Sequence, residues 1–437
     1  MSPAALLSPP GQALLARLSG ADVSGGRALT LASALRADYP PELVAAALTQ
    51  QALRNAAAAK FSRAAEMLFT REGLEQSSAE QVAAHSAARL SPFAVVADLC
   101  CGIGGDLTAL ARPGAGPAGR RVLAVDRDPA SLEFARHNAA VYGGEGRMSA
   151  VCADVREVVA GWPEAPSGTA RDRAGRDGPG RAGAGRDGTG LDGVGTGRPG
   201  AAGIDAVFID PARRSGGRRL RAGDGEPPLA WCLGLPSRVP AVGIKAAPGL
   251  PHELVPPGWE TEFVAVGRSL KEALLWSPAL ATAPRRATVL PGPHILLPER
   301  GGAVPDRSPG EYLLDPNPAV TRAGLVEDLA RLTGTWKIDP MIAFLAADRE
   351  VRTPFARTLR VLDSLPWHEK QLARRLRELD IGAADIRRRG LAGDVELIRR
   401  RLKLSGSRAA VLVATRHRDR PWALICEPLT GQEAAGG

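Results

Sequence analysis

Cysteine, aromatic residues and long apolar runs are all scarce in this chain of 437 residues. The cysteines form no Cys-x-x-Cys pair, which argues against a zinc site or a disulfide framework, and they stand at Cys100, Cys101, Cys152, Cys232 and Cys426. No apolar run reaches the roughly 18 residues of a membrane helix, and the N-terminus lacks a basic segment followed by an apolar one. We therefore expect a cytoplasmic protein with neither a membrane nor a metal partner.

Lysine is also rare, since it supplies only six of the 56 basic residues, which are opposed by 47 acidic ones. The excess positive charge is concentrated between positions 351 and 408, where 15 basic residues face 7 acidic ones. Such a segment suits a polyanionic partner. The chain length predicts two or three domains.

A strand, a glycine turn and a helix follow one another after position 95. Val95–Ala97 is an apolar run typical of a strand, Asp98 follows it, and Leu107 begins a segment with helical spacing. The turn between them contains three glycines, Gly102, Gly104 and Gly105, so a cofactor can lie against its backbone N–H groups. Dinucleotides and S-adenosylmethionine are both bound in this way, and an ordinary strand–helix–strand unit is the alternative for this motif alone.

The next strand helps to separate the two cofactor classes. A dinucleotide-binding fold requires a third glycine where the helix packs on the strand, but in this chain that position is Leu107. The strand 121–126 ends in Asp126, 28 residues after Asp98. A carboxylate at this place can accept both ribose hydroxyls of a bound nucleoside.

Two further carboxylates follow predicted strands. Asp154 either contacts the adenine amino group, as in a methyltransferase, or caps the next helix. Pro211 keeps Asp210 extended at the carboxyl edge of the sheet, where ligands bind in open α/β folds. Lys245 lies within an apolar strand, where its charge is costly unless its tip reaches solvent or a partner.

The periodicity predicts an N-terminal helical region before this sheet. Its helices are expected at 11–18, 29–36, 40–59, 64–70 and 81–90, the last of them after a capping box formed by Ser77 and Glu80. We expect its basic side chains to be solvated, namely Arg54, Lys60, Arg63, Arg71 and Arg89. The sheet domain is expected to continue with a helix at 129–141 and strands at 147–152, 204–209, 240–247, 262–266, 272–276 and 286–290.

A segment rich in Gly, Arg and Asp interrupts the sheet domain at about 163–203. It has too few apolar residues to form a core, so we interpret it as a disordered surface insertion, either a linker or an RNA contact. Residues 292–350 are expected to connect the sheet domain to a basic C-terminal module. That module should contain helices at 367–379 and 394–402, an extended run at 382–389, and a hairpin of 409–415 with 421–427.

Taken together, these motifs resemble the class I S-adenosylmethionine-dependent methyltransferases. The sequence Asp98-Leu-Cys-Cys-Gly-Ile-Gly-Gly105 is similar to the subset that includes the RNA cap trimethylguanosine synthases, and the whole chain is similar to bacterial proteins with a C-terminal THUMP-like domain. The resemblance implies an α/β fold: a Rossmann-like sheet of seven strands, 1–5 parallel and 7 antiparallel, with an N-terminal helical region and a small THUMP-like α/β domain. The domains implied are 1–90, 91–291, the connection 292–350, and 351–430.

The resemblance also implies roles for individual residues. The expected contacts to S-adenosylmethionine come from Asp98, Cys100, Gly102, Gly104, Gly105, Asp106, Asp126, Arg127, Asp154 and Val155. The catalytic candidates are Asp210, Pro211, Arg213 and Lys245. The family's amino-group enzymes carry Asp/Asn-Pro-Pro and an aromatic, whereas this chain has Asp210-Pro-Ala-Arg213 and no aromatic to stack on a base.

These roles lead to a functional hypothesis. Asp210 would accept an N–H of the acceptor amine, and Lys245 and Arg213 either hold a phosphate or carboxylate of the substrate or form a salt bridge with Asp210 or a neighbour. We expect an RNA methyltransferase whose basic module binds RNA, with contacts from Arg387, Arg388, Arg389, Arg399, Arg400 and Lys403. The alternatives are a protein or small-molecule methyltransferase, a non-catalytic RNA-binding protein, and solvated basic faces in the module.

Overall fold

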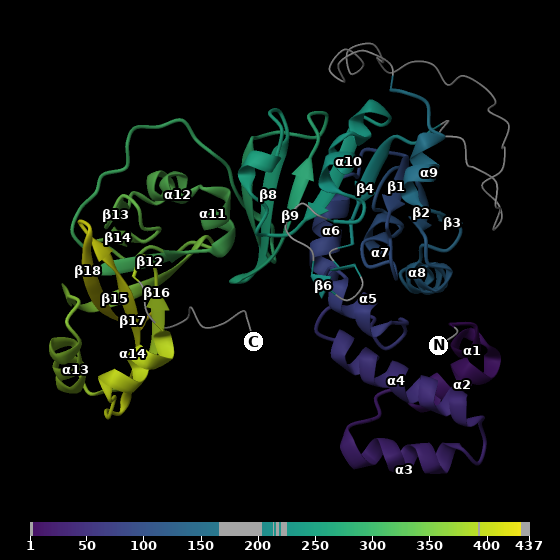
Figure 1. Ribbon diagram of the computed structural model, residues 1–437, viewed down its shortest axis with the longest axis horizontal. Helices are drawn as coiled ribbons and strands as arrows, with labels where there is room; N and C mark the ends of the chain where they lie inside the picture. Colours follow the sequence, from purple (N-terminus) through teal and green to yellow (C-terminus); the bar gives the residue numbers. More distant parts are fainter. Residues whose placement is uncertain are drawn as a thin grey trace. The chain divides into compact units, whose positions relative to one another are not determined.

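The computed structural model describes residues 3–165, 203–212, 214–215, 218–219, 225–391 and 394–429. Most of the Gly/Arg/Asp insertion, and Arg213, lie outside the described residues. The chain forms two compact units, the first of Met1–Glu260 with Leu274–Thr282, and the second of Thr261–Ala273 with Ala283–Gly437 (Figure 1). Within the described residues, no helix combines the length and apolar character that crossing a membrane requires.

The N-terminal region is helical, as predicted. Its helices are α1 (Pro3–Leu7), α2 (Pro9–Arg17), α3 (Gly25–Leu35), α4 (Pro41–Ala57), α5 (Arg71–Gln76) and α6 (Glu80–Arg89). A core of leucines and phenylalanines joins them to the sheet domain, including Leu14, Val44, Phe61, Phe69 and Phe134.

Two local predictions in this region are wrong. Residues 64–70 form turns and extended chain, because side chains of other helices bind their backbone: Asn138 pairs with both polar groups of Leu68, and Arg54 donates to the Met67 carbonyl. The capping box is also absent. Ala79 precedes α6 without a side-chain cap, and Glu80 instead accepts from the Ser62 N–H at 2.7 Å.

The first unit contains the parallel strands 1–5 that the resemblance implies. Its parallel strands are β3 (Met148–Cys152), β2 (Arg121–Asp126), β1 (Val95–Leu99), β4 (Ala206–Ile209) and β7 (Ala241–Ala246), side by side in that order. The strands β9 (Ser269–Trp276) and β8 (Glu260–Val266) follow in the strand order. Only two residues join β8 to β9, and such a short connection requires an antiparallel pair. This is the predicted arrangement of seven strands.

Two more strands follow β8 in this order: one at the position of the strand predicted at 286–290, and one that was not predicted. The strand β10 (Arg285–Leu290) runs parallel to β8, and β11 (His294–Leu296) is antiparallel to β10. A two-residue pair, β5 (Arg214–Ser215) and β6 (Arg218–Arg219), stands apart from the sheet.

Helices cover both faces of the parallel strands (Figure 1). The helices α9 (Val155–Ala160) and α10 (Leu229–Leu233) pack in the core of one face, with Leu99, Val125 and Ile209 from the strands. The helices α7 (Leu107–Leu110) and α8 (Pro129–Val141) contact β2 from the other face. The helix at 129–141 was predicted with these bounds, and Asp128 caps it through the N–H groups of Ala130 and Ser131.

The second unit is built on a sheet of order β13-β14-β12-β15-β18-β17-β16. Its strands are β12 (Tyr312–Pro316), β13 (Trp336–Lys337), β14 (Leu345–Ala347), β15 (Ala356–Pro366), β16 (Ile381–Arg388), β17 (Arg408–His417) and β18 (Arg420–Pro428). The predicted hairpin is confirmed as β17 and β18, which are antiparallel. Residues 292–350, expected to connect two domains, contribute three strands to this sheet.

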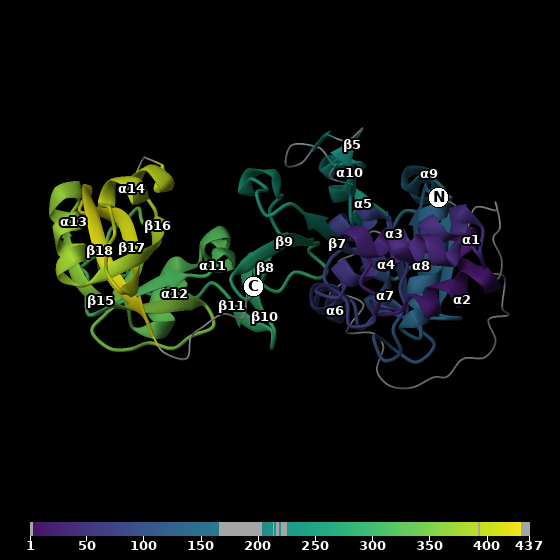
Figure 2. The ribbon, with the colours of Figure 1, turned by 90° about the horizontal axis from the view of Figure 1, so that it is seen from below.

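Alternate residues of the hairpin serve the two faces of this sheet. Leu412 and Ile425 pack under the helices α13 (Glu369–Glu378) and α14 (Val395–Leu402), which lie on the same side of the sheet (Figure 2). Val413 and Leu424 pack on the opposite face with Phe344. Two short helices, α11 (Pro318–Ala323) and α12 (Val326–Thr333), are separated where Gly324 adopts a left-handed conformation.

Candidate active site

The turn after β1 has a backbone that glycine makes possible. Gly102 and Gly104 have φ of 52° and 86°, and Cys100, at the place of the usual first glycine, has φ of 60°. A Cβ on Gly104 would lie 3.0 Å from the Cα of Ala135 in α8, so this glycine allows close packing of the turn on the helix. A Cβ on Gly102 would meet no atom within 4 Å, so its backbone stays open to a ligand.

A cavity of about 610 Å³ opens over this turn, at the carboxyl ends of the parallel strands. It brings together most of the predicted residues: Asp98, Cys100, Gly102, Gly105, Asp106, Asp126, Arg127, Asp154, Val155, Asp210 and Pro211. Gly104 does not line it, and Lys245 lies behind it in contact with two of its carboxylates.

The cavity is strongly acidic. Among the described residues, its lining holds nine carboxylates and one basic side chain, Arg127; the carboxylates are Glu72, Glu75, Asp98, Asp106, Asp126, Asp128, Asp154, Asp210 and Glu226. S-Adenosylmethionine carries a sulfonium and an ammonium against a single carboxylate. The carboxylates that line the cavity therefore suit the positive charges of this cofactor, whereas they would repel a phosphate.

Asp98 is the most deeply buried of these acids. Its side chain is 1% exposed, and its Oδ2 has no hydrogen-bond partner among the described residues. Burial raises the pKa of the Asp98 carboxyl well above its ordinary value, and the neighbouring charge of Asp106 raises this pKa further. A buried oxygen without a partner, at the wall of the cavity, is what a hydrogen-bonding or cationic ligand would satisfy.

Asp126 and Asp154 are both held by backbone N–H groups. Asp126 accepts from Gly102 at 2.8 Å and from Asp128 at 3.0 Å, so it ties the end of β2 to the glycine turn. A carboxylate has about four acceptor positions, which leaves room for ribose hydroxyls. Asp154 is the N-cap of α9, the alternative that the sequence left open, and it still lines the cavity. The hydrogen bond from Arg156 lowers the pKa of Asp154.

Lys245 links two carboxylates of the site. Its ammonium is 2.6 Å from Oδ2 of Asp106 and 2.6 Å from Oδ2 of Asp210. The lysine is 4% exposed, whereas the Asp210 side chain is 26% exposed at the cavity. The salt bridge that the sequence offered as an alternative is therefore present. Lys245 therefore fixes the position of the Asp210 carboxylate at the cavity.

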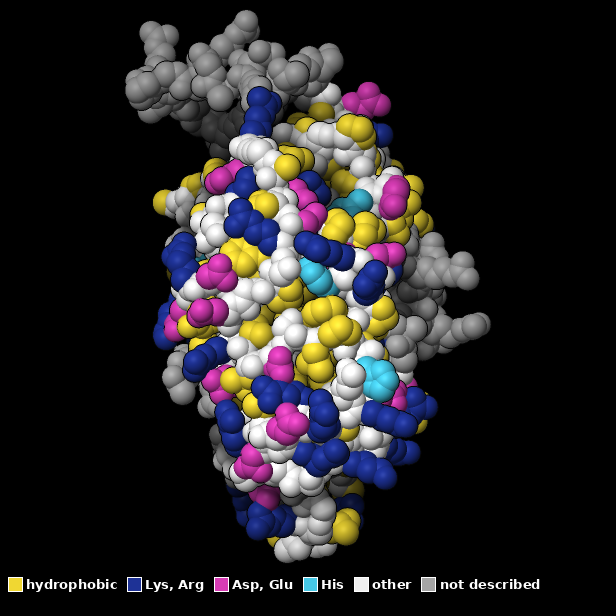
Figure 3. Space-filling view, turned by 90° about the vertical axis from the view of Figure 1, so that its left-hand side faces the viewer, with side chains coloured by type: hydrophobic (Ala, Val, Ile, Leu, Met, Phe, Trp, Pro, Cys, Tyr) yellow, Lys and Arg dark blue, Asp and Glu magenta, His cyan; other side chains and the backbone are white. Residues whose placement is uncertain are grey.

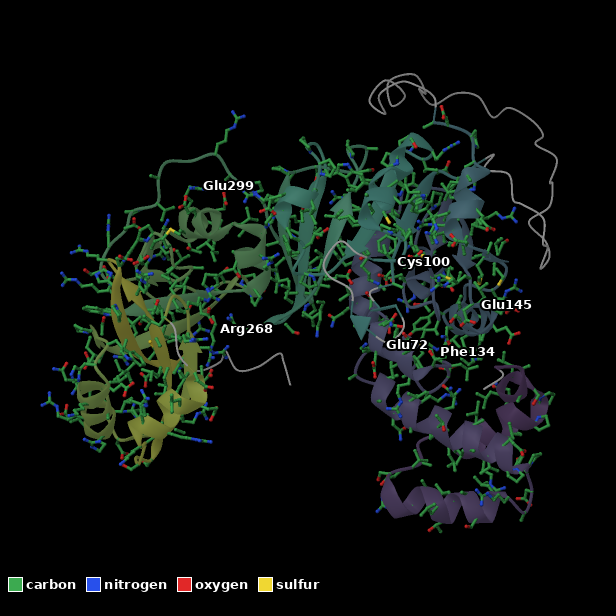
Figure 4. The ribbon with its side chains drawn as sticks, viewed as in Figure 1. Glu72, Cys100, Phe134, Glu145, Arg268 and Glu299 are labelled. Atoms are coloured by element: carbon green, nitrogen blue, oxygen red, sulfur yellow. The ribbon has the colours of Figure 1, made fainter. Side chains whose placement is uncertain are left out.

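Sequence reasoning missed one wall of the cavity. It comes from the N-terminal helical region, through Thr70, Glu72, Gly73, Glu75, Gln76 and Ser77 of α5 and its ends, and Figure 4 labels Glu72 together with Cys100 of the glycine turn. Glu226 and Pro227, after the β5–β6 pair, were also missed. The acidic and amide side chains of Leu74-Glu-Gln76 were the available signal, but no local pattern connects a short helix to a turn some 25 residues later.

A second concavity, of about 830 Å³, lies in the second unit and is basic. Among the described residues it is lined by one carboxylate, Asp385, and four cations, Arg357, Arg399, Arg400 and Lys403, so three of the predicted RNA-binding residues border one concavity. We call this surface the basic groove. Arg387 and Arg388 lie near it on β16, and Arg387 pairs with Asp385 at 2.9 Å. Figure 3 shows one side of this unit, where dark-blue side chains crowd the lower part.

Arg389 has a different environment from the groove residues. Its guanidinium is 2.9 Å from Oδ1 of the buried Asp315, and it stacks over Phe344 with 4.8 Å to the ring centroid. It also donates to the Ala343 carbonyl at 2.5 Å. These contacts stabilise the second unit, so replacing Arg389 would perturb the fold as well as any RNA contact.

Family profiles match three parts of the chain. Residues 93–171 match the RNA cap guanine-N2 methyltransferase family, residues 356–428 the THUMP domain-like family, and residues 2–57 a domain family of unknown function.

Whole-chain relatives give the same result. The chain is 35% identical over 395 residues to an uncharacterized S-adenosylmethionine-dependent methyltransferase of Mycobacterium tuberculosis, found in strains CDC 1551 and H37Rv, and the alignment covers 87% of this chain and 93% of that protein. A methyltransferase crystal structure from Porphyromonas gingivalis W83 has the same fold, with a TM-score of 0.67 at 21% identity over 90% of this chain and 92% of that one. The chain therefore belongs to the S-adenosylmethionine-dependent methyltransferases, as one that carries a C-terminal THUMP-like domain.

Proposed function

We propose that this methyltransferase modifies an amino nitrogen of a base in RNA. The observation that carries the proposal is the division of charge between two sites. The basic groove of the second unit suits phosphates, and the acidic cavity of the first unit suits a nitrogen that donates N–H groups. The matches to the RNA cap guanine-N2 methyltransferase and THUMP domain-like families point in the same direction.

Methyl transfer depends more on aligning the acceptor nitrogen with the methyl group and the sulfur than on acid–base catalysis. S-Adenosylmethionine supplies an electrophilic methyl group on a sulfonium. Asp210 would accept one N–H of the acceptor amine, which directs the nitrogen lone pair and favours the positive charge that develops on it. Lys245 would hold that carboxylate in its orientation through the 2.6 Å contact. A phosphate contact by Arg213, which lies outside the described residues, stays a prediction.

The remaining cofactor contacts are part of the same proposal. Asp126 would accept the ribose hydroxyls and Asp154 the adenine amino group. The turn from Cys100 to Gly105, with its open Gly102 backbone, would hold the portion of the cofactor near the sulfonium. Arg127 and Val155 would border the nucleoside, because they follow Asp126 and Asp154 in the lining.

A cationic side chain of a protein is the second candidate acceptor, because the same acidic lining also suits a lysine or arginine. Purified protein, incubated with radiolabelled S-adenosylmethionine, separates the two. Total RNA, protein and small-molecule extracts from cells that lack the gene serve as acceptors. We expect label in RNA with the wild-type chain and none with Asp210→Ala. Label in protein would favour the second candidate and refute the RNA proposal.

A further inference from the structure

Helix α5 lies directly against the glycine turn of the cofactor cavity. A Cβ on Gly73 would be 2.7 Å from Cγ2 of Ile103, and a Cβ on Gly105 would be 3.1 Å from Cβ of Ser77. Both helix and turn therefore use glycine where they touch. The glycine turn that α5 contacts follows β1, whereas Asp126 and Asp154, expected at the nucleoside, follow β2 and β3.

A lysine side chain is hydrogen-bonded to the C-terminal end of this helix. The Lys60 ammonium donates to the carbonyls of Leu74 at 2.6 Å, Ser77 at 3.2 Å and Glu75 at 3.4 Å. These are carbonyls at the C-terminal end of α5, which a cation stabilises through hydrogen bonds and through the helix dipole. Lys60 is thus not merely solvated, as its sequence context suggested, but fixes the position of α5.

Helix α5 also carries a carboxylate that lines the cavity. Glu72 lines the cavity, and the Gln76 amide donates to its Oε1 at 2.9 Å, which orients the group and leaves Oε2 for a ligand. No salt bridge neutralises Glu72 within the described part of the chain. The unpartnered Oδ2 of Asp98 lies at the same cavity on β1, and it is a second oxygen there that can accept a hydrogen bond from a ligand.

We propose that Glu72 binds the ammonium of the methionyl end of S-adenosylmethionine, and that Lys60 is the positioning residue that holds Glu72 in place. The N-terminal helical region thereby completes the cofactor site. The chemistry requires only a charge-assisted hydrogen bond between a carboxylate and an ammonium. The inference rests on the cofactor and not on the identity of the acceptor.

Two ligands that differ only at the amino-acid end test it directly. S-Adenosylhomocysteine carries the ammonium and carboxylate, whereas 5′-methylthioadenosine lacks both. By calorimetry, Glu72→Gln should weaken S-adenosylhomocysteine binding about tenfold and leave 5′-methylthioadenosine within about twofold. Glu133→Gln, an exposed glutamate of α8 that does not line the cavity, is the matched control and should change neither affinity.

Lys60→Met gives a second measurement of the same kind. It should weaken S-adenosylhomocysteine more than 5′-methylthioadenosine, and Lys60→Arg, which keeps a donor, should recover part of the loss. An equal loss for both ligands, or no loss with Glu72→Gln, would overturn the inference. Since no acceptor is present in these titrations, either result leaves the RNA proposal unaffected.

Discussion

Replacing Lys245 with methionine should destabilise the first unit and abolish catalysis together. The lysine is 4% exposed, and its ammonium is the shared partner of Asp106 and Asp210, each at 2.6 Å. Methionine keeps the unbranched shape of the stem but removes the charge. The variant therefore leaves two carboxylates facing each other beside Asp98, in a site where each carboxylate raises the cost of ionising the others.

The magnitude follows from the burial of the pair. Removing one partner of a buried ion pair costs about 3–5 kcal/mol, because a charge remains buried without compensation. The Asp210 side chain is 26% exposed, so water relieves part of this cost, and we expect a loss of about 3 kcal/mol in the free energy of unfolding. The double variant Lys245→Met/Asp106→Asn removes one of the like charges and should recover a substantial part of that loss.

Urea unfolding followed by circular dichroism measures this effect. Because the chain has two units, the transition that shifts on adding S-adenosylhomocysteine identifies the first unit. Arg136→Met, which removes an exposed cation of α8 in the same unit, is the control and should be nearly neutral. A loss under about 1 kcal/mol in the free energy of unfolding would refute the reasoning.

Three further predictions concern other parts of the two sites. Asp126→Ala should weaken S-adenosylmethionine binding by roughly 1–3 kcal/mol in calorimetry, the scale of a lost charged hydrogen bond, and unchanged affinity would exclude the ribose contact. Asp98→Asn should flatten the pH dependence of stability. Because the pKa of Asp98 is raised, the folded chain keeps a proton on this carboxyl that the unfolded chain loses above about pH 4. The stability of the wild-type chain should therefore fall as the pH rises from about 4 through the raised pKa. Parallel curves of stability against pH for the wild-type chain and the variant would contradict this. Changing Arg399, Arg400 and Lys403 together to Ala should weaken RNA binding and reduce its salt slope by about one to three counterions in filter binding, without affecting S-adenosylmethionine, whereas an unchanged slope would exclude the basic groove.

The sheet was the most predictable part of the molecule. The strands β1 to β4 each end at or near an aspartate that belongs to a recognisable motif. The carboxyl ends of these strands can therefore be located in the sequence from Asp98, Asp126, Asp154 and Asp210. The strands β10 and β11 carry no such motif. The pairing of β10 with β8 and of β11 with β10 is a tertiary property that the period of a single strand does not specify.

The environment of individual charges was much harder to predict. Lys60 and Arg54 were expected to be solvated, but both donate to carbonyls of the chain between residues 66 and 77. That segment has helical spacing at 64–70, yet its backbone is bound by side chains of α4 and α8, and tertiary contacts override the local preference. Arg389 differs from Arg387 in the same way, since only folding brings it beside Asp315 and Phe344.

The central claim is that the acidic cavity, through Asp210, methylates a base in RNA. Mass spectrometry of nucleosides from total RNA tests it most directly, in cells that lack the gene and are complemented with either the wild-type chain or Asp210→Ala. We predict one methylated nucleoside that is absent without the gene, restored by the wild-type chain, and not restored by Asp210→Ala although that variant still binds S-adenosylmethionine. Identical nucleoside profiles in all of these cells would contradict the account.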